Sequence, residues 1–250
     1  CKPIEHGAAI VIHSLTKYIG GHGTAVAGSI VDSGNFDWTA DPKRQPLFNE
    51  PDASYGGAIW GKVVPELTGA NIPFAVRARV CLLRDLGSAL APDNAFAIIQ
   101  GLETVALRMK QHCENAQKVV NFLKTHDEVT KVIYSTEHEK TIADRASTYL
   151  KGGNGPMVGI ELKGGIEAGK KFIESLKMFY HVANIGDARS LAIHPASTTH
   201  SQLNEKELAA SGVTQSYVRL CIGIEHIDDI IDDLHQALNK SSKTDLKAVG

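Results

Sequence analysis

A lysine that stands between two hydroxyl residues and a run of glycines is the part of this sequence most suited to chemistry. The stretch reads HSLTKYIGGHG over residues 13–23. A lysine amine is a nucleophile only when it is neutral, and burial favours the neutral form. The hydroxyls of Ser14 and Thr16 can donate hydrogen bonds to a phosphate. An amine beside such hydroxyls suits a covalent bond to pyridoxal phosphate. The alternative interpretation is a strand–turn–strand with a surface lysine at position 17.

Two apolar runs flank this stretch and predict the elements that position it. Residues 8–12 are typical of a short buried strand, and residues 25–31 of a second strand. The glycines between them allow a sharp backbone turn. Because ligands of α/β sheets bind at strand ends, we expect Lys17 to face a ligand there.

The motif Ser-x-Thr-Lys-Tyr-Ile-Gly-Gly-His-Gly resembles the signature of the Cys/Met-metabolism family of pyridoxal phosphate-dependent enzymes. The similarity continues to the C-terminal helix and covers nearly the whole chain. It implies an α/β protein, the C-terminal part of a fold-type I transferase. Residues 1–101 would end the large α/β/α cofactor domain, and residues 102–250 would form a small C-terminal α/β domain. The resemblance also implies that Lys17 binds the cofactor and moves protons, and that Ser14 and Thr16 bind its phosphate.

Two further residues acquire roles from the same resemblance. Arg219 lies in YVRLCIGIE, which matches the family's C-terminal strand, where an arginine pairs with the substrate α-carboxylate. A guanidinium grips a carboxylate through two hydrogen bonds, although an arginine on an apolar strand can also form a structural ion pair. Asn184 lies in VANIGD, a segment that lines the family's substrate site, and its alternative role is that of a turn residue. We expect Glu225 to be a structural partner.

Residues 35–70 distinguish the chain within the family. They are rich in proline, glycine, asparagine and aromatic residues and predict a long inserted loop. Such an insertion is typical of the O-acetylhomoserine sulfhydrylases. These enzymes of methionine biosynthesis convert O-acetyl-L-homoserine and sulfide into L-homocysteine and acetate by γ-replacement. The alternatives are a cystathionine γ-synthase or a methionine or cystathionine γ-lyase of the same family, and, from another class, a non-catalytic truncated homologue or subunit.

The N-terminus predicts a fragment, because Cys1-Lys2-Pro3 leads almost at once into a core strand. We expect the chain to be the C-terminal part of a longer protein. The resemblance places the pyridine-nitrogen partner, the stacking aromatic residue and the phosphate loop upstream. We therefore expect residues 1–250 alone to bind pyridoxal phosphate weakly and to be inactive. The family's usual assembly predicts a homotetramer.

Composition gives no support for a nucleic-acid or membrane partner, and the resemblance implies small-molecule substrates. The 250 residues are 43% hydrophobic, and the net charge of −2 gives no electrostatic reason to bind nucleic acid or an anionic membrane. No apolar run approaches the roughly 20 residues of a membrane span. The four cysteines are widely spaced and are expected to be small buried residues in a reducing, cytoplasmic compartment. The histidines form no HExxH pair, so no metal site is expected.

Hydrophobic periodicity predicts helices and strands over most of the remaining chain. The expected helices are 71–87 with Asn71 as its N-cap, 92–125 with a joint at Gly101, 141–150, 166–179, 204–211, and one from residue 228. The expected strands are 129–134, 157–162, 182–184, 191–193 and 217–222. Apolar stripes expected to face the core are Phe96, Ile99, Leu102, Val105 and Leu107, then Ala116, Val119, Val120 and Leu123. The tail from Lys240 is expected to fray.

Overall fold

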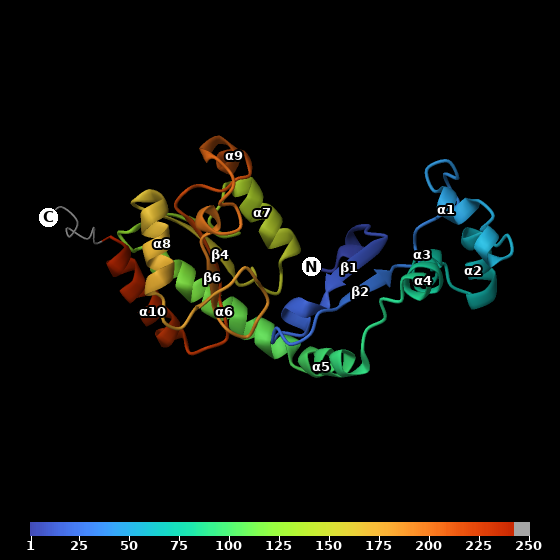
Figure 1. Ribbon diagram of the computed structural model, residues 1–250, viewed down its shortest axis with the longest axis horizontal. Coiled ribbons are helices and arrows are strands. Elements are labelled where there is room, and N and C mark those ends of the chain that lie inside the picture. The colour runs from blue at the N-terminus through green and yellow to red at the C-terminus, as the bar shows by residue number, and fades with distance from the viewer. Residues whose placement is uncertain (243–250) are drawn as a thin grey trace. The chain divides into compact units, whose positions relative to one another are not determined.

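The computed structural model describes residues 1–242, and the chain divides into two compact units. One unit is formed by Lys2–Leu15 and Val26–Ala97, and the other by Cys1, Thr16–Ala25 and the residues from Ile98 onward. The ribbon in Figure 1 shows the elements of both. The domain boundary that the sequence predicts between residues 101 and 102 stays a prediction for the complete protein.

A five-stranded sheet with the order β3-β4-β7-β6-β5 organises the larger unit. Its neighbouring strands are antiparallel, except that β5 and β6 are parallel. The strands are β3 (Val129–Ile133), β4 (Met157–Leu162), β5 (Tyr180–His181), β6 (Leu191–Ile193) and β7 (Tyr217–Cys221).

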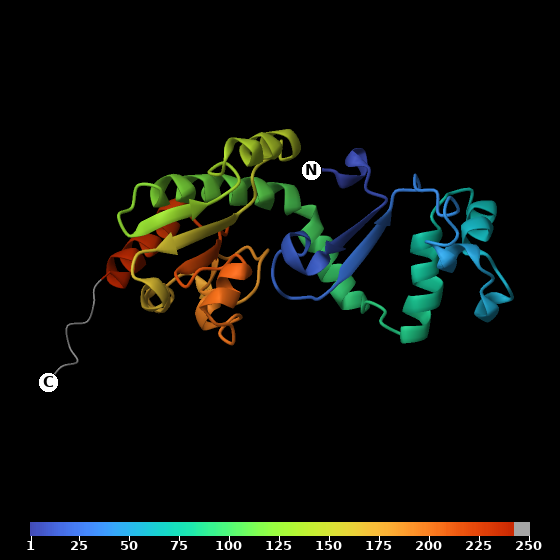
Figure 2. The ribbon, with the colours of Figure 1, turned by 90° about the horizontal axis from the view of Figure 1, so that it is seen from above.

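Helices pack with this sheet around one hydrophobic core. The helices are α6 (Val105–Leu123), α7 (Lys140–Tyr149), α8 (Gly165–Ser175), α9 (Glu205–Ala210) and α10 (Ile227–Ser241). Figure 2 shows α6 alongside β3 and β4. Alternate residues of the central strands enter the core with side chains from α6, α8 and α10, among them Ile160, Leu220, Leu123, Phe172 and Leu234. The residues between those positions, including Arg219, face the other side of the sheet.

The smaller unit combines a two-stranded sheet with a small aromatic core. Strands β1 (Ile10–Ser14) and β2 (Gly28–Asp32) are antiparallel, with Ile12 opposite Ile30. Its helices are α1 (Pro46–Asn49), α2 (Trp60–Thr68), α3 (Pro73–Arg77) and α4 (Arg84–Leu86), with a wide helical turn over Ala78–Leu83. Helix α5 (Pro92–Glu103) belongs to both units.

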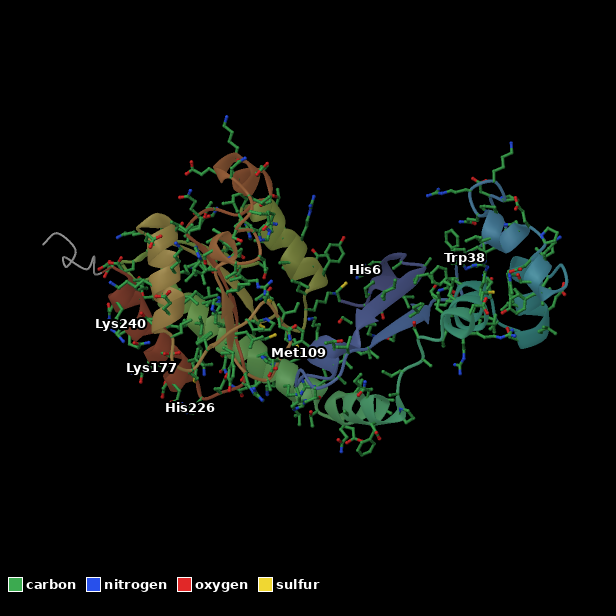
Figure 3. The ribbon with its side chains drawn as sticks, viewed as in Figure 1. His6, Trp38, Met109, Lys177, His226 and Lys240 are labelled. Atoms are coloured by element: carbon green, nitrogen blue, oxygen red, sulfur yellow. The ribbon has the colours of Figure 1, made fainter. Side chains whose placement is uncertain are left out.

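The predicted loop over residues 35–70 proves to be largely structured. It contains α1 and α2, and its aromatic side chains form a core because Trp38 packs on Phe48 and Phe74. Trp38 is labelled in Figure 3. Asn71 is not the N-cap of α3, since its side-chain amide donates to the carbonyl of Phe36 instead. Gly87 ends α4 with a positive φ of 69°, as the sequence predicts.

The apolar stripes behave differently in the two halves of the predicted helix 92–125. The second stripe is fully buried as predicted, whereas Phe96, Ile99, Leu102 and Leu107 of the first are exposed in this chain. The joint lies at Thr104 and not at Gly101. Gly101 allows a close approach instead, since a Cβ there would lie 2.2 Å from the carbonyl oxygen of Gly20.

Several smaller expectations are settled by the same structure. Strand 157–162 is confirmed, whereas the strand expected at 182–184 forms at Tyr180–His181. Strand β1 is present but not buried, because Ile12 is 72% exposed. Cys81 and Cys221 are buried, Cys113 is half-buried and Cys1 is exposed. Helix α10 extends to Ser241, and the rest of the predicted frayed tail, residues 243–250, lies outside the described residues. Within residues 1–242, no helix combines the length and apolar character needed to cross a bilayer.

One buried carboxylate joins α10 to the segment that follows α8. Asp233 accepts hydrogen bonds from the backbone N–H groups of Lys177, Met178 and Phe179, at 2.8 to 3.3 Å, and from the side chain of Gln236. Lys177 is labelled beside α10 in Figure 3. These bonds fix the chain where it enters β5 and the loop beyond it.

Replacing this carboxylate should weaken the fold. Asp233→Ala leaves three backbone donors without their acceptor, so we expect the free energy of unfolding to fall by about 3 kcal/mol. Urea denaturation measures it. The matched control is Asp232→Ala on the exposed side of the same helix, for which a change within about 0.5 kcal/mol is expected. Equal effects of the two substitutions would contradict the stabilising role assigned to the Asp233 carboxylate.

Candidate active site

Lys17 lies in a tight turn, of which the residues from Thr16 onward belong to the larger unit. The turn spans Leu15–Ile19, and the backbone of Lys17 departs from helical angles, with φ −85° and ψ −132°. Its carbonyl accepts a 2.7 Å hydrogen bond from the N–H of Gly21. Gly21 and Gly23 have positive φ angles of 75° and 66°, a conformation that favours glycine. The sequence therefore predicts this turn correctly.

A loop from the C-terminal sheet packs directly on the backbone of this turn. Gly186 lies so close that a Cβ there would be 2.7 Å from Cα of Lys17. The N–H of Ala188 donates to the carbonyl of Gly21 at 2.8 Å. The loop that carries Asn184 is thus held against the lysine by backbone contacts.

Three of the predicted site residues converge at this contact. The Lys17 amine donates a hydrogen bond to the side-chain oxygen of Asn184. Arg219 on β7 donates through Nη2 to the backbone carbonyl of Asn184 at 3.1 Å. All three residues are half-buried. An amine and a guanidinium therefore meet on the two sides of one asparagine, an arrangement that suits a substrate with a carboxylate.

The two predicted phosphate ligands lie on different elements of the structure. Ser14 is the exposed last residue of β1, paired with Gly28, whereas Thr16 is half-buried in the lysine turn. Their role towards a phosphate stays a prediction.

Glu225 stabilises the other end of the loop and is a structural partner, as expected from the sequence. Its carboxylate accepts hydrogen bonds from the backbone N–H of Ser190 at 2.6 Å and from the Ser190 hydroxyl at 2.9 Å. The same hydroxyl accepts a bond from the N–H of Gly223. Asn115 on α6 donates to the carbonyls of Gly223 and Glu225. The loop is therefore tied to both β7 and α6.

Sequence reasoning missed the residues beneath the lysine turn. The Tyr18 hydroxyl lies 3.2 Å from Sγ of Cys221, and the Tyr18 ring meets the His112 ring edge-on at 5.5 Å between centroids. Burial, together with the Cys221 thiol, raises the pKa of Tyr18 far above its ordinary value. Tyr18 is therefore a neutral anchor. The only sequence signal for it is its position next to Lys17.

His112 is a fully buried histidine on α6 that contacts this anchor. Its Nδ1 donates to the carbonyl of Ile222 at 2.7 Å. Its Nε2 has no hydrogen-bond partner among the described residues. Burial lowers the pKa of His112, chiefly because the charged ring would lose its hydration. His112 is thus neutral at pH 7, with its proton on Nδ1.

The residues present fit pyridoxal phosphate. The cofactor needs a primary amine for its aldehyde and hydrogen-bond donors for its phosphate. Lys17 supplies a half-buried amine oriented by Asn184. Thr16 and Ser14 supply hydroxyls within three residues of that amine in the sequence, and the glycine turn that follows adds backbone N–H groups.

Comparison with known proteins assigns the chain to a family. A family model for the Cys/Met metabolism PLP-dependent enzymes matches residues 1–239. The chain therefore belongs to this family, and the resemblance seen in the sequence is confirmed, together with the pyridoxal phosphate dependence that it implies.

Its relatives are sulfhydrylases and related synthases. The chain is 49% identical over 242 residues to the O-acetyl-L-homoserine sulfhydrylase of Leptospira meyeri, a match that covers 95% of this chain and 54% of that protein. It is 44% identical to the homocysteine synthase of Schizosaccharomyces pombe, covering 95% of this chain and 54% of that protein. The chain thus spans about half the length of the curated relatives it matches.

Solved structures confirm the fold class. An O-acetylhomoserine (thiol)-lyase of Campylobacter jejuni, which contains a pyridoxyl-lysine phosphate, matches with a TM-score of 0.84 and 39% identity over 95% of this chain and 55% of its own. The cystathionine γ-synthase of Xanthomonas oryzae matches with a TM-score of 0.72 and 29% identity, over 96% of this chain and 52% of its own. The chain has the fold-type I architecture expected from its sequence.

Buried His112 should make stability depend on pH. Because its folded pKa lies below the ordinary value of about 6.5, the unfolded chain binds the proton first as the pH falls. This contribution to stability is complete above the unfolded pKa and is lost below it. Between about pH 7 and pH 5.5 we expect the parent to lose about 1 kcal/mol more unfolding free energy than His112→Asn does.

Urea denaturation at the two pH values measures this difference. The control is His138→Asn, which changes an exposed histidine and should keep the pH dependence of the parent. A His112→Asn variant with the same pH dependence as the parent would show that folding does not shift the pKa of His112.

Proposed function

We propose that the complete protein, meaning this chain with the part that its relatives have beyond the matched region, is an O-acetyl-L-homoserine sulfhydrylase. It would convert O-acetyl-L-homoserine and sulfide into L-homocysteine and acetate. The observation that carries this proposal is the convergence of Lys17, Asn184 and Arg219 at one contact. The similarity to the Leptospira meyeri enzyme supports the choice of substrate.

Lys17 is the proposed catalytic base and acid. When bound, pyridoxal phosphate would supply an electron sink for the bonds that break next to the substrate amino group. Lys17 would hold the cofactor before the substrate arrives and then move protons at the substrate carbons. Its long flexible stem allows the amine to reach more than one atom, and Asn184 supplies the acceptor that orients it.

Arg219 is the proposed carboxylate-binding residue. Its hydrogen bond to the carbonyl of Asn184 fixes the guanidinium, which carries five N–H donors in a planar fork. A bidentate pair with the α-carboxylate would set the orientation of the α-carbon towards Lys17. In this proposal the two anionic groups have separate ligands. Arg219 binds the substrate carboxylate, and the hydroxyls of Ser14 and Thr16 bind the cofactor phosphate.

A second candidate is a cystathionine γ-synthase, favoured by the structural match to the Xanthomonas oryzae enzyme. Its lower identity, 29% against 49% for the sulfhydrylase, makes it the weaker candidate. Incubation of the complete protein with O-acetyl-L-homoserine and either sulfide or cysteine separates the two. Turnover with neither would favour a non-catalytic homologue. The homotetramer, the cytoplasmic location and the inactivity of residues 1–250 alone stay predictions.

The role of Lys17 can be tested by covalent labelling. Borohydride reduction of the complete protein with pyridoxal phosphate should place one pyridoxyl group on the peptide that contains Lys17, as mass spectrometry would show. In Lys17→Arg the label should disappear, and kcat should fall by about 1,000-fold or more because the proton-transfer group is lost. Lys177→Arg, at an exposed lysine, should retain both. A label on another lysine in the parent would exclude Lys17.

The role of Arg219 predicts a defect in binding one substrate. Arg219→Gln should raise KM for O-acetyl-L-homoserine by about 10- to 100-fold, because a charge-assisted bidentate pair is lost. The KM for sulfide, which has no carboxylate, should change little. Arg145→Gln, at an exposed arginine of α7, is the control. The carboxylate role would be refuted by a parent-like KM for O-acetyl-L-homoserine in steady-state kinetics.

A further inference from the structure

Arg108 is a buried arginine of α6 whose hydrogen bonds lead to the lysine turn. Its Nη1 donates to the carbonyl of Tyr18 at 2.8 Å, and its Nη2 to the carbonyl of Ile19 at 3.1 Å. These are the first two carbonyls after Lys17. The guanidinium therefore holds the backbone that directly follows the proposed catalytic amine.

The other side of the guanidinium is fixed to the helices. Nη2 also donates to the carbonyl of Gly101 at 2.6 Å, and Nε donates to the hydroxyl of Thr104 at 3.2 Å. One planar group thus connects the end of α5 and the start of α6 to the turn. A lysine could not replace it, since a single ammonium lacks the fork that spans these oxygens.

The packing around Arg108 leaves little freedom. The residue is only 6% exposed. A Cβ on Gly21 would lie 2.1 Å from Nη1, so the turn and the guanidinium are in direct contact. Burial lowers the pKa of Arg108 through lost hydration. Each of these four hydrogen bonds goes to an uncharged oxygen, although a buried cation usually pairs with a carboxylate. The arrangement orders the turn at the cost of that desolvation.

We propose that Arg108 is a positioning residue for Lys17, which fixes the turn so that the amine meets its reaction partners in one geometry. The proposal rests on the proposed function. Displacement of a reacting group by about 1 Å can lower a rate by about 100-fold. Arg108 touches no substrate in this arrangement, so its loss should act on the proton-transfer step and leave substrate binding largely intact.

The structural arm of the test is hydrogen exchange in the complete protein, with and without bound pyridoxal phosphate. In Arg108→Met the amides of residues 18–24 should exchange at least about 10-fold faster, because the turn loses its anchor. The amide of Gly21, which donates to Lys17, is the reporter. Strands β4 and β7 should keep the exchange rates of the parent. Arg145→Met is the matched control.

The kinetic arm separates positioning from binding. Arg108→Met and Arg108→Lys should lower kcat by about 10- to 100-fold while KM for O-acetyl-L-homoserine stays within about 3-fold. This pattern is the opposite of that expected for Arg219→Gln. Thr104→Val removes the partner of Nε and the bond from the Thr104 hydroxyl to the Gly101 carbonyl, but leaves both bonds from Arg108 to the turn. It should give a smaller loss of kcat and a smaller increase in exchange.

The outcomes distinguish this proposal from the proposed function. Faster exchange spread evenly over the strands, or loss of folding in Arg108→Met, would show a general structural role and overturn the proposal. Unchanged exchange at residues 18–24 would overturn it as well. If the parent lacked sulfhydrylase activity, the proposed function would fail, whereas the exchange arm would still report whether Arg108 orders the lysine turn.

Discussion

Close packing of backbone on backbone at Lys17 is the constraint on which the candidate site depends. Gly186 lies against the Lys17 backbone and Gly101 against the Gly20 backbone, while Gly21 lies against the guanidinium of Arg108. At each of these positions a Cβ would lie within 2.7 Å of a neighbouring atom, closer than packed atoms approach. The lysine turn is thus enclosed by segments that are distant in the sequence, and glycine is the residue that permits the enclosure.

This enclosure couples the proposed cofactor and substrate residues. The loop that contacts the Lys17 backbone also carries Asn184, which accepts from the amine and from Arg219. Glu225 and Ser190 fix the far end of the loop to β7. A shift of the loop would therefore move the amine acceptor and the guanidinium acceptor together. Hydrogen bonds connected in this way favour a single geometry of the loop.

The features predicted correctly from the sequence are those with a local signal. The lysine turn follows from adjacent residues, and β4 follows from alternation within one strand. Arg108 and His112 have no such signal. Their partners in the lysine turn and at Ile222 lie 89 to 110 residues away, and the sequence pattern around both is that of an amphipathic helix. Two predictions of burial were wrong for a related reason. The first apolar stripe of residues 92–125 and strand β1 were both expected to be buried, and both are largely exposed in this chain. Periodicity identifies an apolar face but not the segment that covers it.

The proposed site residues identify a class of reaction, but they do not distinguish between the substrates of that class. Arg219 would recognise an α-carboxylate, and Lys17 would act at carbons near the amino group, features common to the substrates of a sulfhydrylase and of a γ-synthase. Discrimination between sulfide and cysteine must then come from side chains around the γ-carbon, where the substrates differ, because specificity is a difference between binding energies. The proposed role of Arg108 does not depend on whether sulfide or cysteine is the second substrate, because an ordered lysine turn serves every reaction that begins with proton removal by Lys17.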